Sequence, residues 1–260
     1  MQLTCRNKIL PLHRPVVMGI LNLTPDSFYD GGKLKDDRSL LLQAEKMLRE
    51  GAALLDVGGM SSRSGAHLLS PTEELLRVQP AVQLLLQHFP DCILSIDTLQ
   101  ASVAEACLQT GAHLINDISA GTYDPRMLEV VASGGAAYCL MHMQGLPHSM
   151  QEQPTYTDVV REVAAFFTQR VAACTQAGIQ HLVLDPGFGF GKTQAHNYSL
   201  LRHLQQLAPP HLPLLCGVSR KSMVYKVLQS GPQEALNGTT VLHTLALLQG
   251  AHILRAHDVR

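Results

Sequence analysis

The stretch Ile93-Leu94-Ser95-Ile96-Asp97-Thr98 decides the fold, because a short apolar run ends there in a carboxylate. We count the same pattern eight times along the chain. The other runs end at Asn22, Asp56, Asn116-Asp117, His142, Asp185, Ser219-Arg220-Lys221 and Arg255-Ala256-His257. If the runs are parallel strands, these polar side chains converge on one rim, which is where a (β/α)8 barrel builds its active site.

Helical patterns separate the apolar runs, and this alternation predicts parallel βα units. The expected strands cover residues 16–21, 54–57, 93–96, 113–115, 136–141, 181–184, 213–217 and 252–254. The expected helices cover residues 37–50, 71–89, 101–109, 125–131, 158–177, 198–206 and 237–249. The predicted fold class is α/β: a single-domain (β/α)8 TIM barrel over residues 1–260. Its final C-terminal helix is expected to be missing, because the sequence stops soon after the eighth strand.

Composition and charge exclude several classes of protein. A chain of 260 residues fits one barrel of about 250 residues. The formal net charge of −1 carries no polyelectrolyte signature, so we expect neither nucleic acid nor an anionic membrane surface as partner. No apolar stretch reaches the roughly 18–20 residues of a membrane span, and residues 1–15 lack the apolar core of a secretory signal. The expected location is the cytoplasm.

The cysteines and histidines give no metal or disulfide signature. The six cysteines are scattered singly without a C-x-x-C pair, which predicts reduced structural thiols in the cytosol. The 13 histidines form no H-E-x-x-H motif, and we expect most of them to lie on the surface.

Two segments on the expected rim are rich in turn-forming residues. Residues 22–32 fit an ordinary surface loop and a substrate lid equally well. Residues 185–193, DPGFGFGKT, suggest a nucleotide loop, but Pro186 stands where a Walker A motif needs glycine. A dinucleotide fingerprint fails too, because its third glycine is misplaced and no helix is expected to open at Lys192-Thr193. We interpret this segment as a loop whose backbone and Phe190 approach a ligand closely.

The rim residues together predict a polar site for a small molecule. A lone aspartate at a strand end is often only the N-cap of the next helix. A set of carboxylate, amide and ammonium groups instead complements a flat heterocycle with an amino group, a ring N–H and a carbonyl on one edge. The members of this set are Asp97, Asn116, Asp185 and Lys221. Arg255 and His257, expected beside Asn22, predict an anion or metal–anion site, the alternative being an ion pair between Arg255 and Asp258.

Eight motifs in this order resemble the dihydropteroate synthase family over nearly the whole chain. They are MGILNLTPDSF (18–28), DVGG (56–59), SIDT (95–98), NDI (116–118), LMHMQG (140–145), LDPGFGFGK (184–192), SRKS (219–222) and RAHDV (255–259). The resemblance implies an Mg²⁺-assisted transferase that condenses 6-hydroxymethyl-7,8-dihydropterin diphosphate with p-aminobenzoate. The implied products are 7,8-dihydropteroate and diphosphate. It also implies inhibition by sulfonamides and a homodimer.

The resemblance implies a role for individual residues. Asp97, Asn116, Asp185 and Lys221 would hold the pterin edge, Met143 would pack on the pterin face, and Asn22 would ligate the metal. Ser62, Arg63, Arg255 and His257 would contact the diphosphate, while Phe28, Phe190 and Ser222 would shape the p-aminobenzoate pocket. The residues expected to take part in catalysis are Asp97, Lys221, Arg255 and His257.

The second loop departs from the family pattern Gly-Gly-Glu-Ser-Thr-Arg-Pro-Gly. Met60 replaces the carboxylate and Ser64 replaces the proline, which predicts a looser loop and weaker binding of p-aminobenzoate and sulfonamides. Two alternative functions are considered. One is a pterin-binding methyltransferase, which would have no use for the Arg255 and His257 pair. The other is a pterin-binding paralogue with weak or no synthase activity.

Overall fold

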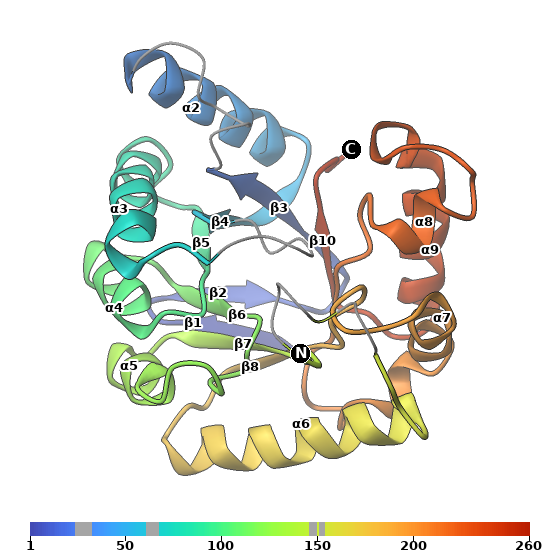
Figure 1. Ribbon diagram of the computed structural model, residues 1–260. Coiled ribbons are helices and arrows are strands. Elements are labelled where there is room, and N and C mark those ends of the chain that lie inside the picture. The colour runs from blue at the N-terminus through green and yellow to red at the C-terminus, as the bar shows by residue number, and fades with distance from the viewer. Residues whose placement is uncertain (24–32, 61–67, 146–149, 151–153) are drawn as a thin grey trace.

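The computed structural model describes residues 1–23, 33–60, 68–145, 150 and 154–260. Its centre is an eight-stranded parallel sheet in the order β8-β7-β6-β5-β4-β3-β10-β9. An isolated parallel bridge between Leu184 and Leu214 joins the two edge strands, so the sheet curls into a nearly closed barrel that helices surround (Figure 1). The strands are β3 (Val16–Asn22), β4 (Ala52–Gly58), β5 (Ile93–Asp97), β6 (Leu114–Asp117), β7 (Ala137–Met141), β8 (Leu182–Asp185), β9 (Leu215–Cys216) and β10 (Ile253–Ala256). The predicted strands and barrel are confirmed.

The helices also follow the predicted order. They are α2 (Lys33–Arg49), α3 (Pro71–His88), α4 (Ala101–Thr110), α5 (Met127–Gly134), α6 (Val159–Gln176), α7 (Gln194–Arg202), α8 (Ser222–Tyr225) and α9 (Leu236–Leu248), with 3-10 turns η1 (Leu204–Gln206) and η2 (Pro232–Glu234). One expectation was wrong, because a helix does open at Lys192-Thr193. The Thr193 hydroxyl accepts the backbone N–H of His196 at 3.2 Å and so caps the first turn of α7. Residues 257–260, after β10, form no helix.

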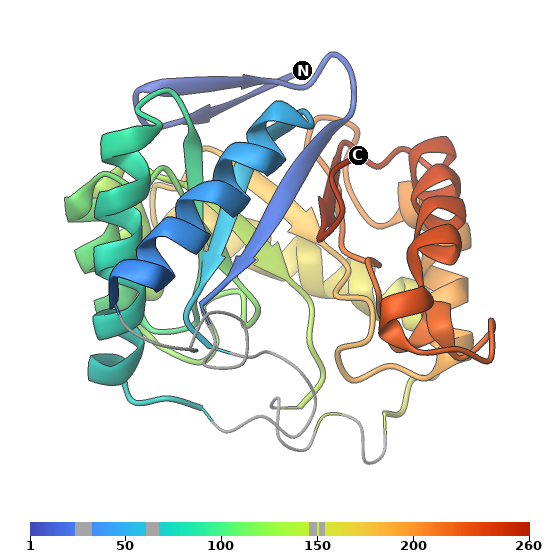
Figure 2. The ribbon, with the colours of Figure 1, turned by 90° about the horizontal axis from the view of Figure 1, so that it is seen from above.

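An N-terminal hairpin that the sequence patterns did not predict covers one end of the barrel. Strands β1 (Gln2–Cys5) and β2 (Lys8–Pro11) pair antiparallel. They lie across the end of the barrel where β3 begins, at the top of Figure 2. Leu3 and Leu10 pack there against the inward-facing Met18 and Leu54. The hairpin therefore closes the barrel interior at the end opposite to the rim.

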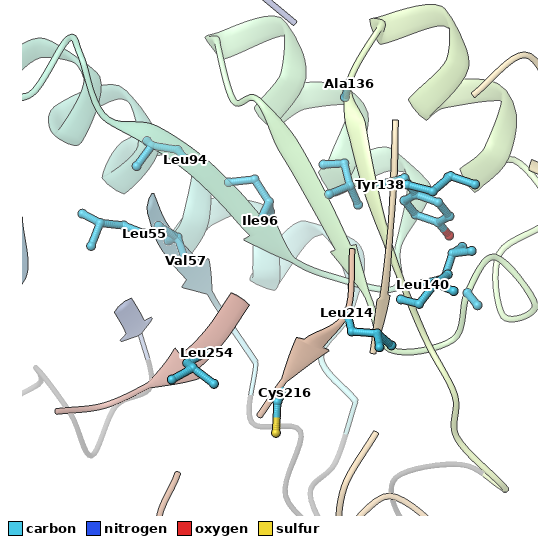
Figure 3. Packing of buried hydrophobic residues seen from close by; sticks show 14 of the residues in the cluster. Leu55, Val57, Leu94, Ile96, Ala136, Tyr138, Leu140, Leu214, Cys216 and Leu254 are labelled. Atoms are coloured by element: carbon cyan, nitrogen blue, oxygen red, sulfur yellow. The ribbon is translucent and has the colours of Figure 1, made fainter. Parts of the chain in front are cut away.

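Strand alternation sorts the barrel side chains into two sets. Leu55, Ile96 and Tyr138 face outward and pack in the layer between strands and helices (Figure 3). The inward-facing residues nearest the hairpin are apolar and form a separate cluster. Because side chains alternate with a period of two, the residues two positions later also face inward, one layer closer to the rim. These residues, which include Asp56, Ser95 and Asn116, line the rim.

All six cysteines are buried and none forms a disulfide, as the sequence predicted. Within the described ranges, no helix is long and apolar enough to cross a membrane.

Two of the histidines that the structure describes, His113 and His142, are buried. His113, 3% exposed, accepts the backbone N–H of Leu94 at its Nδ1 atom, at 3.1 Å. Burial lowers the pKa of His113 to about 4. His142 is 6% exposed, and burial lowers its pKa to about 3. Both imidazoles are therefore neutral in the folded protein near neutral pH.

The neutral buried histidines predict acid-sensitive stability. Because their folded pKa values lie below the ordinary 6.5, the unfolded chain takes up protons first, and stability falls as the pH drops below 6.5 toward 4. We expect a slope of up to about 1.4 kcal/mol per pH unit for each histidine, measured by urea unfolding between pH 7 and pH 5. His113→Gln should reduce this slope and the exposed His88→Gln should not. Equal slopes in both variants would contradict the assignment.

Candidate active site

Asp56 is the centre of the polar side chains at the rim. It is fully buried, and its carboxylate accepts three side-chain hydrogen bonds. The donors are Ser95 Oγ at 2.5 Å, Asn116 Nδ2 at 3.0 Å and Arg255 Nε at 2.6 Å. The sequence analysis did not name Asp56 as a site residue, although Asp56 ends an apolar run as Asp97 does. Its role is to fix Asn116 and Arg255 in position.

Arg255 bridges two buried carboxylates. Besides its bond to Asp56, it donates from Nη2 to Asp97 Oδ2 at 2.8 Å, and its side chain is only 17% exposed. Burial by itself would lower the pKa of Arg255, but the two carboxylates raise it above its usual range. The alternative ion pair between Arg255 and Asp258 is wrong, because Asp258 accepts both guanidinium bonds of Arg220, at 2.8 and 2.6 Å. Arg255 therefore stays cationic at the base of the rim.

Neither Asp97 nor Asn116 is the N-cap of the helix that follows its strand; the N-cap of α5 is Arg126. The N-cap of α4 is Gln100, and the N–H of Ala101 binds Asp124 instead of Asp97. Burial raises the pKa of Asp97 to about 7, against the opposing influence of Arg255. The side-chain oxygen of Asn116 is buried and has no hydrogen-bond partner among the described residues. A buried acceptor in that state is available to a donor on a ligand or to an ordered water.

Asp185 and Lys221 converge beside Gly217, which has no side chain. A Cβ atom on Gly217 would lie 3.8 Å from Lys221 Nζ, 3.9 Å from Asp185 Oδ2 and 3.8 Å from Arg255 Cβ. Gly217 could not be identified as a site residue from the sequence, because a glycine in an apolar run has no functional group. A larger residue there would fill the volume that the three charged side chains surround.

Asp185 and Lys221 also form hydrogen bonds with backbone groups. Asp185 Oδ1 accepts the N–H of Gly187 at 2.8 Å, and burial raises the pKa of this carboxyl. Lys221 Nζ donates to the carbonyl of Phe188 at 2.6 Å and lies 4.7 Å from the centroid of the Phe190 ring. Burial lowers the pKa of Lys221 to about 8, although Asp185 acts in the opposite direction. Lys221 thus remains largely protonated at neutral pH.

An apolar cluster gathers at the same end of the barrel as the polar groups. Its buried members come from the ends of several strands and from the loops that follow them: Met60, Leu99, Ile118, Met141, Met150 and Phe190. Met143 packs against the cluster and is partly buried. A few polar groups beside an apolar wall are typical of a site for a flat, partly aromatic ligand.

The comparisons with known proteins agree with this geometry. The family described as pterin binding enzyme matches residues 18–257. Dihydropteroate synthase from Escherichia coli (strain K12) is 47% identical over 262 residues, covering 100% of this chain and 92% of that protein. A crystal structure of Yersinia pestis dihydropteroate synthase with a sulfonamide drug complex superposes with a TM-score of 0.93 at 49% identity, covering 100% of this chain and 94% of that one. The chain belongs to the pterin-binding enzyme family.

A third relative extends the likeness across species. Dihydropteroate synthase from Xanthomonas albilineans, solved with 4-aminobenzoic acid, matches with a TM-score of 0.92 and 41% identity, over 99% of this chain and 93% of that one. The relatives are transferases, and this pterin-binding enzyme is a member of the same class. The expected family resemblance is confirmed.

Asn22 and His257 lie near each other across neighbouring strands of this pterin-binding enzyme. Asn22 ends β3, and β10, which His257 follows, pairs with β3 through Ala256 and Gly19. His257 Nδ1 lies 3.0 Å from Ser219 Oγ, and the backbone N–H of His257 donates to the same oxygen at 3.2 Å. Ser219 therefore sets the orientation of the imidazole. Sequence reasoning quoted Ser219 only as part of a motif.

The donor set near Asn22 fits Mg²⁺ better than a transition metal. Among the residues that the structure describes, no three His, Cys, Asp or Glu side chains are grouped to hold a metal ion. Mg²⁺ uses oxygen ligands and commonly takes one or two from the protein and the rest from substrate phosphate and water. The partly exposed Asn22 carries one such amide oxygen at the rim.

Several predicted site residues cannot be placed. Phe28, Ser62 and Arg63, together with Ser64 of the second loop, lie outside the described residues. Ser222 is described and is the first residue of α8, directly after Lys221. Met60, at the edge of the second loop, is 8% exposed and packs in the apolar cluster.

Proposed function

We propose that this enzyme is a dihydropteroate synthase of folate biosynthesis. It would condense 6-hydroxymethyl-7,8-dihydropterin diphosphate with p-aminobenzoate to give 7,8-dihydropteroate and diphosphate. The observation that carries the proposal is the set of polar groups around the space at Gly217, beside an apolar wall. The relatives support it by their names, by the sulfonamide bound to the Yersinia pestis protein and by the 4-aminobenzoic acid bound to the Xanthomonas albilineans protein.

The rim groups are complementary to the edge of a pterin ring. Asp185 supplies a carboxylate for the amino group and a ring N–H, and Lys221 donates to ring carbonyl and nitrogen acceptors. Asn116 is fixed by Asp56 and offers its unpartnered oxygen to a further donor. An analogue without these groups would leave buried polar atoms unpaired, which gives strong discrimination.

Loss of diphosphate is the step that needs the most electrostatic help. The bond between the pterin methylene carbon and the diphosphate oxygen breaks, and the electron pair leaves with the diphosphate. Arg255, kept cationic by two carboxylates, supplies positive charge for that group, and His257, oriented by Ser219, supplies a hydrogen-bond donor. Bound Mg²⁺, which Asn22 would ligate, neutralises part of the diphosphate charge.

The second half of the reaction forms the new carbon–nitrogen bond. Loss of diphosphate leaves positive charge on the pterin, which the carboxylate form of Asp97, at the rim end of β5, would stabilise. The amine of p-aminobenzoate attacks the methylene carbon and releases one proton. Water is the competing nucleophile, so the apolar cluster of Met60, Met141 and Phe190 favours the aromatic amine by excluding water. Sulfonamides would compete for this p-aminobenzoate position.

The test is a direct assay of the purified protein. We expect dihydropteroate to form from dihydropterin diphosphate, p-aminobenzoate and Mg²⁺, to stop on addition of EDTA and to resume on addition of excess Mg²⁺. Pterin binding without product would instead identify a paralogue that has lost the synthase activity. Product formation that persists in EDTA would contradict the metal assignment while leaving the reaction intact.

A further inference from the structure

Lys192 is the most heavily bonded buried cation among the described residues that the proposed reaction leaves without a role. Its side chain lies inside the protein, with the residue 3% exposed. Four acceptors surround its Nζ atom: His142 Nδ1 at 2.9 Å and the carbonyl oxygens of His142 at 3.1 Å, Gly187 at 3.0 Å and Phe190 at 2.9 Å. An ammonium has three N–H donors, so it can bond three of these four acceptors at once. Burial lowers the pKa of Lys192 to about 7, although Asp185 acts in the opposite direction.

The cage lies where two segments of the rim meet backbone to backbone. A Cβ atom on Gly187 would lie 2.0 Å from the carbonyl oxygen of His142, and one on Gly191 would lie 2.2 Å from that of Gln144. Both glycines have positive φ, at 66° and 62°. Only glycine permits this approach. It brings carbonyl oxygens from both segments together, and a shared donor is needed to offset their mutual repulsion.

The two segments that Lys192 joins carry the walls of the active site. The segment after β8 provides the Phe188 carbonyl that holds Lys221 Nζ, and the Phe190 ring on which Lys221 lies. The segment after β7 carries Met143, which packs against the apolar cluster. Lys192 is therefore linked to Lys221 through Phe190, whose carbonyl Lys192 binds and whose ring Lys221 contacts.

His142 is oriented so that its Nδ1 atom faces Lys192 Nζ. An imidazole accepts a hydrogen bond at Nδ1 only when that nitrogen carries no proton, and burial lowers the pKa of His142 to about 3. The ring also packs edge-on against Phe166, with centroids 4.8 Å apart, which fixes its orientation. Protonated Lys192 therefore donates to the unprotonated Nδ1 atom of a neutral imidazole.

We propose that Lys192 is a positioning residue that clamps the segment after β8 onto the segment after β7, so that Lys221 and Phe190 are held in the geometry that binds the pterin. The role in turnover rests on the proposed function. The role in pterin binding rests only on the membership of the pterin-binding family. The two can therefore fail separately.

The test compares Lys192→Met, which keeps the length of the side chain and removes the ammonium, with Lys46→Met at an exposed position on α2. The dissociation constant for 6-hydroxymethylpterin is measured by calorimetry at a temperature where circular dichroism shows both variants folded. We expect Lys192→Met to weaken binding at least about 10-fold, and kcat/KM to fall by about 10- to 100-fold, while Lys46→Met matches the wild type. A residue with only a structural role would lower the melting temperature and leave the dissociation constant unchanged.

A second variant keeps the proposal testable if Lys192→Met does not fold. His142→Phe removes one of the four acceptors and retains the packing against Phe166, so we expect a smaller loss of pterin affinity in the same direction. Wild-type affinity in His142→Phe together with unfolded Lys192→Met would overturn the proposal, as would wild-type affinity in folded Lys192→Met. If the wild type binds pterin and forms no dihydropteroate, the proposed function fails and the binding comparison still decides the role of Lys192.

Discussion

Lys221→Ala is expected to lower kcat/KM for dihydropteroate formation by roughly 10³-fold while the protein stays folded. The ammonium is the donor that lies beside the Asp185 carboxylate at Gly217. Its loss would leave the ring acceptors of a bound pterin without a partner. Stability should survive, because the folded protein loses one hydrogen bond to a carbonyl and is relieved of a desolvated charge.

Asp185→Asn tests the other half of the same contact. The amide keeps an oxygen for the N–H of Gly187 but removes the negative charge that complements the pterin amino group and ring N–H. We expect a loss of turnover similar to that of Lys221→Ala. Steady-state kinetics and thermal melting of both variants are compared with Lys226→Ala, whose side chain is exposed five positions further along the chain. Normal activity in either rim variant would refute the assignment of this pair.

Arg255→Met is expected to cost about 3–5 kcal/mol of folding free energy and to abolish activity. The guanidinium is the partner of two buried carboxylates, at 2.6 Å from Asp56 and 2.8 Å from Asp97. Its removal leaves both charges in a poorly solvated place. Because Asp97 already has a pKa of about 7, protonation relieves part of this penalty, so the loss of stability should be smaller at pH 6 than at pH 8. Urea unfolding at the two pH values measures it.

The matched control is Arg220→Met. Arg220 also binds a carboxylate through two guanidinium nitrogens, but its side chain is 33% exposed and that of Asp258 is 28% exposed. Water can solvate Asp258 when the arginine is lost, so we expect a cost of about 1 kcal/mol or less. Adding Asp97→Asn to Arg255→Met should restore part of the stability and none of the activity. Equal costs in the two arginine variants would show that buried charge is not the cause.

The barrel and most of the rim could be predicted from local sequence. A buried parallel strand is a short apolar run, and the polar residue that ends it lies at the carboxyl edge of the sheet. This reasoning found Asp97, Asn116 and Asp185 at the rim ends of β5, β6 and β8. It could not rank Asp56 with them, because a structural carboxylate and a ligand-binding one end an apolar run in the same way.

The partners of each charge were decided only in three dimensions. Arg255 lies 158 positions after Asp97, and the alternative partner considered from the sequence, Asp258, instead pairs with Arg220. Strand order determines such pairs: β10 closes against β3, which places Arg255 across the barrel interior from the ends of β4 and β5.

The burial of Lys192 also could not be predicted from the local sequence. A lysine in a glycine-rich segment is expected to be exposed to solvent. The local sequence does not indicate that Gly187 and Gly191 let this segment contact the backbone of His142 and Gln144. The sequence by itself determined the order of elements and the residue types on the rim, because strand and helix periodicities are local. Only the tertiary structure decided which charges are desolvated and what holds them, because burial and pairing depend on segments that are distant along the chain.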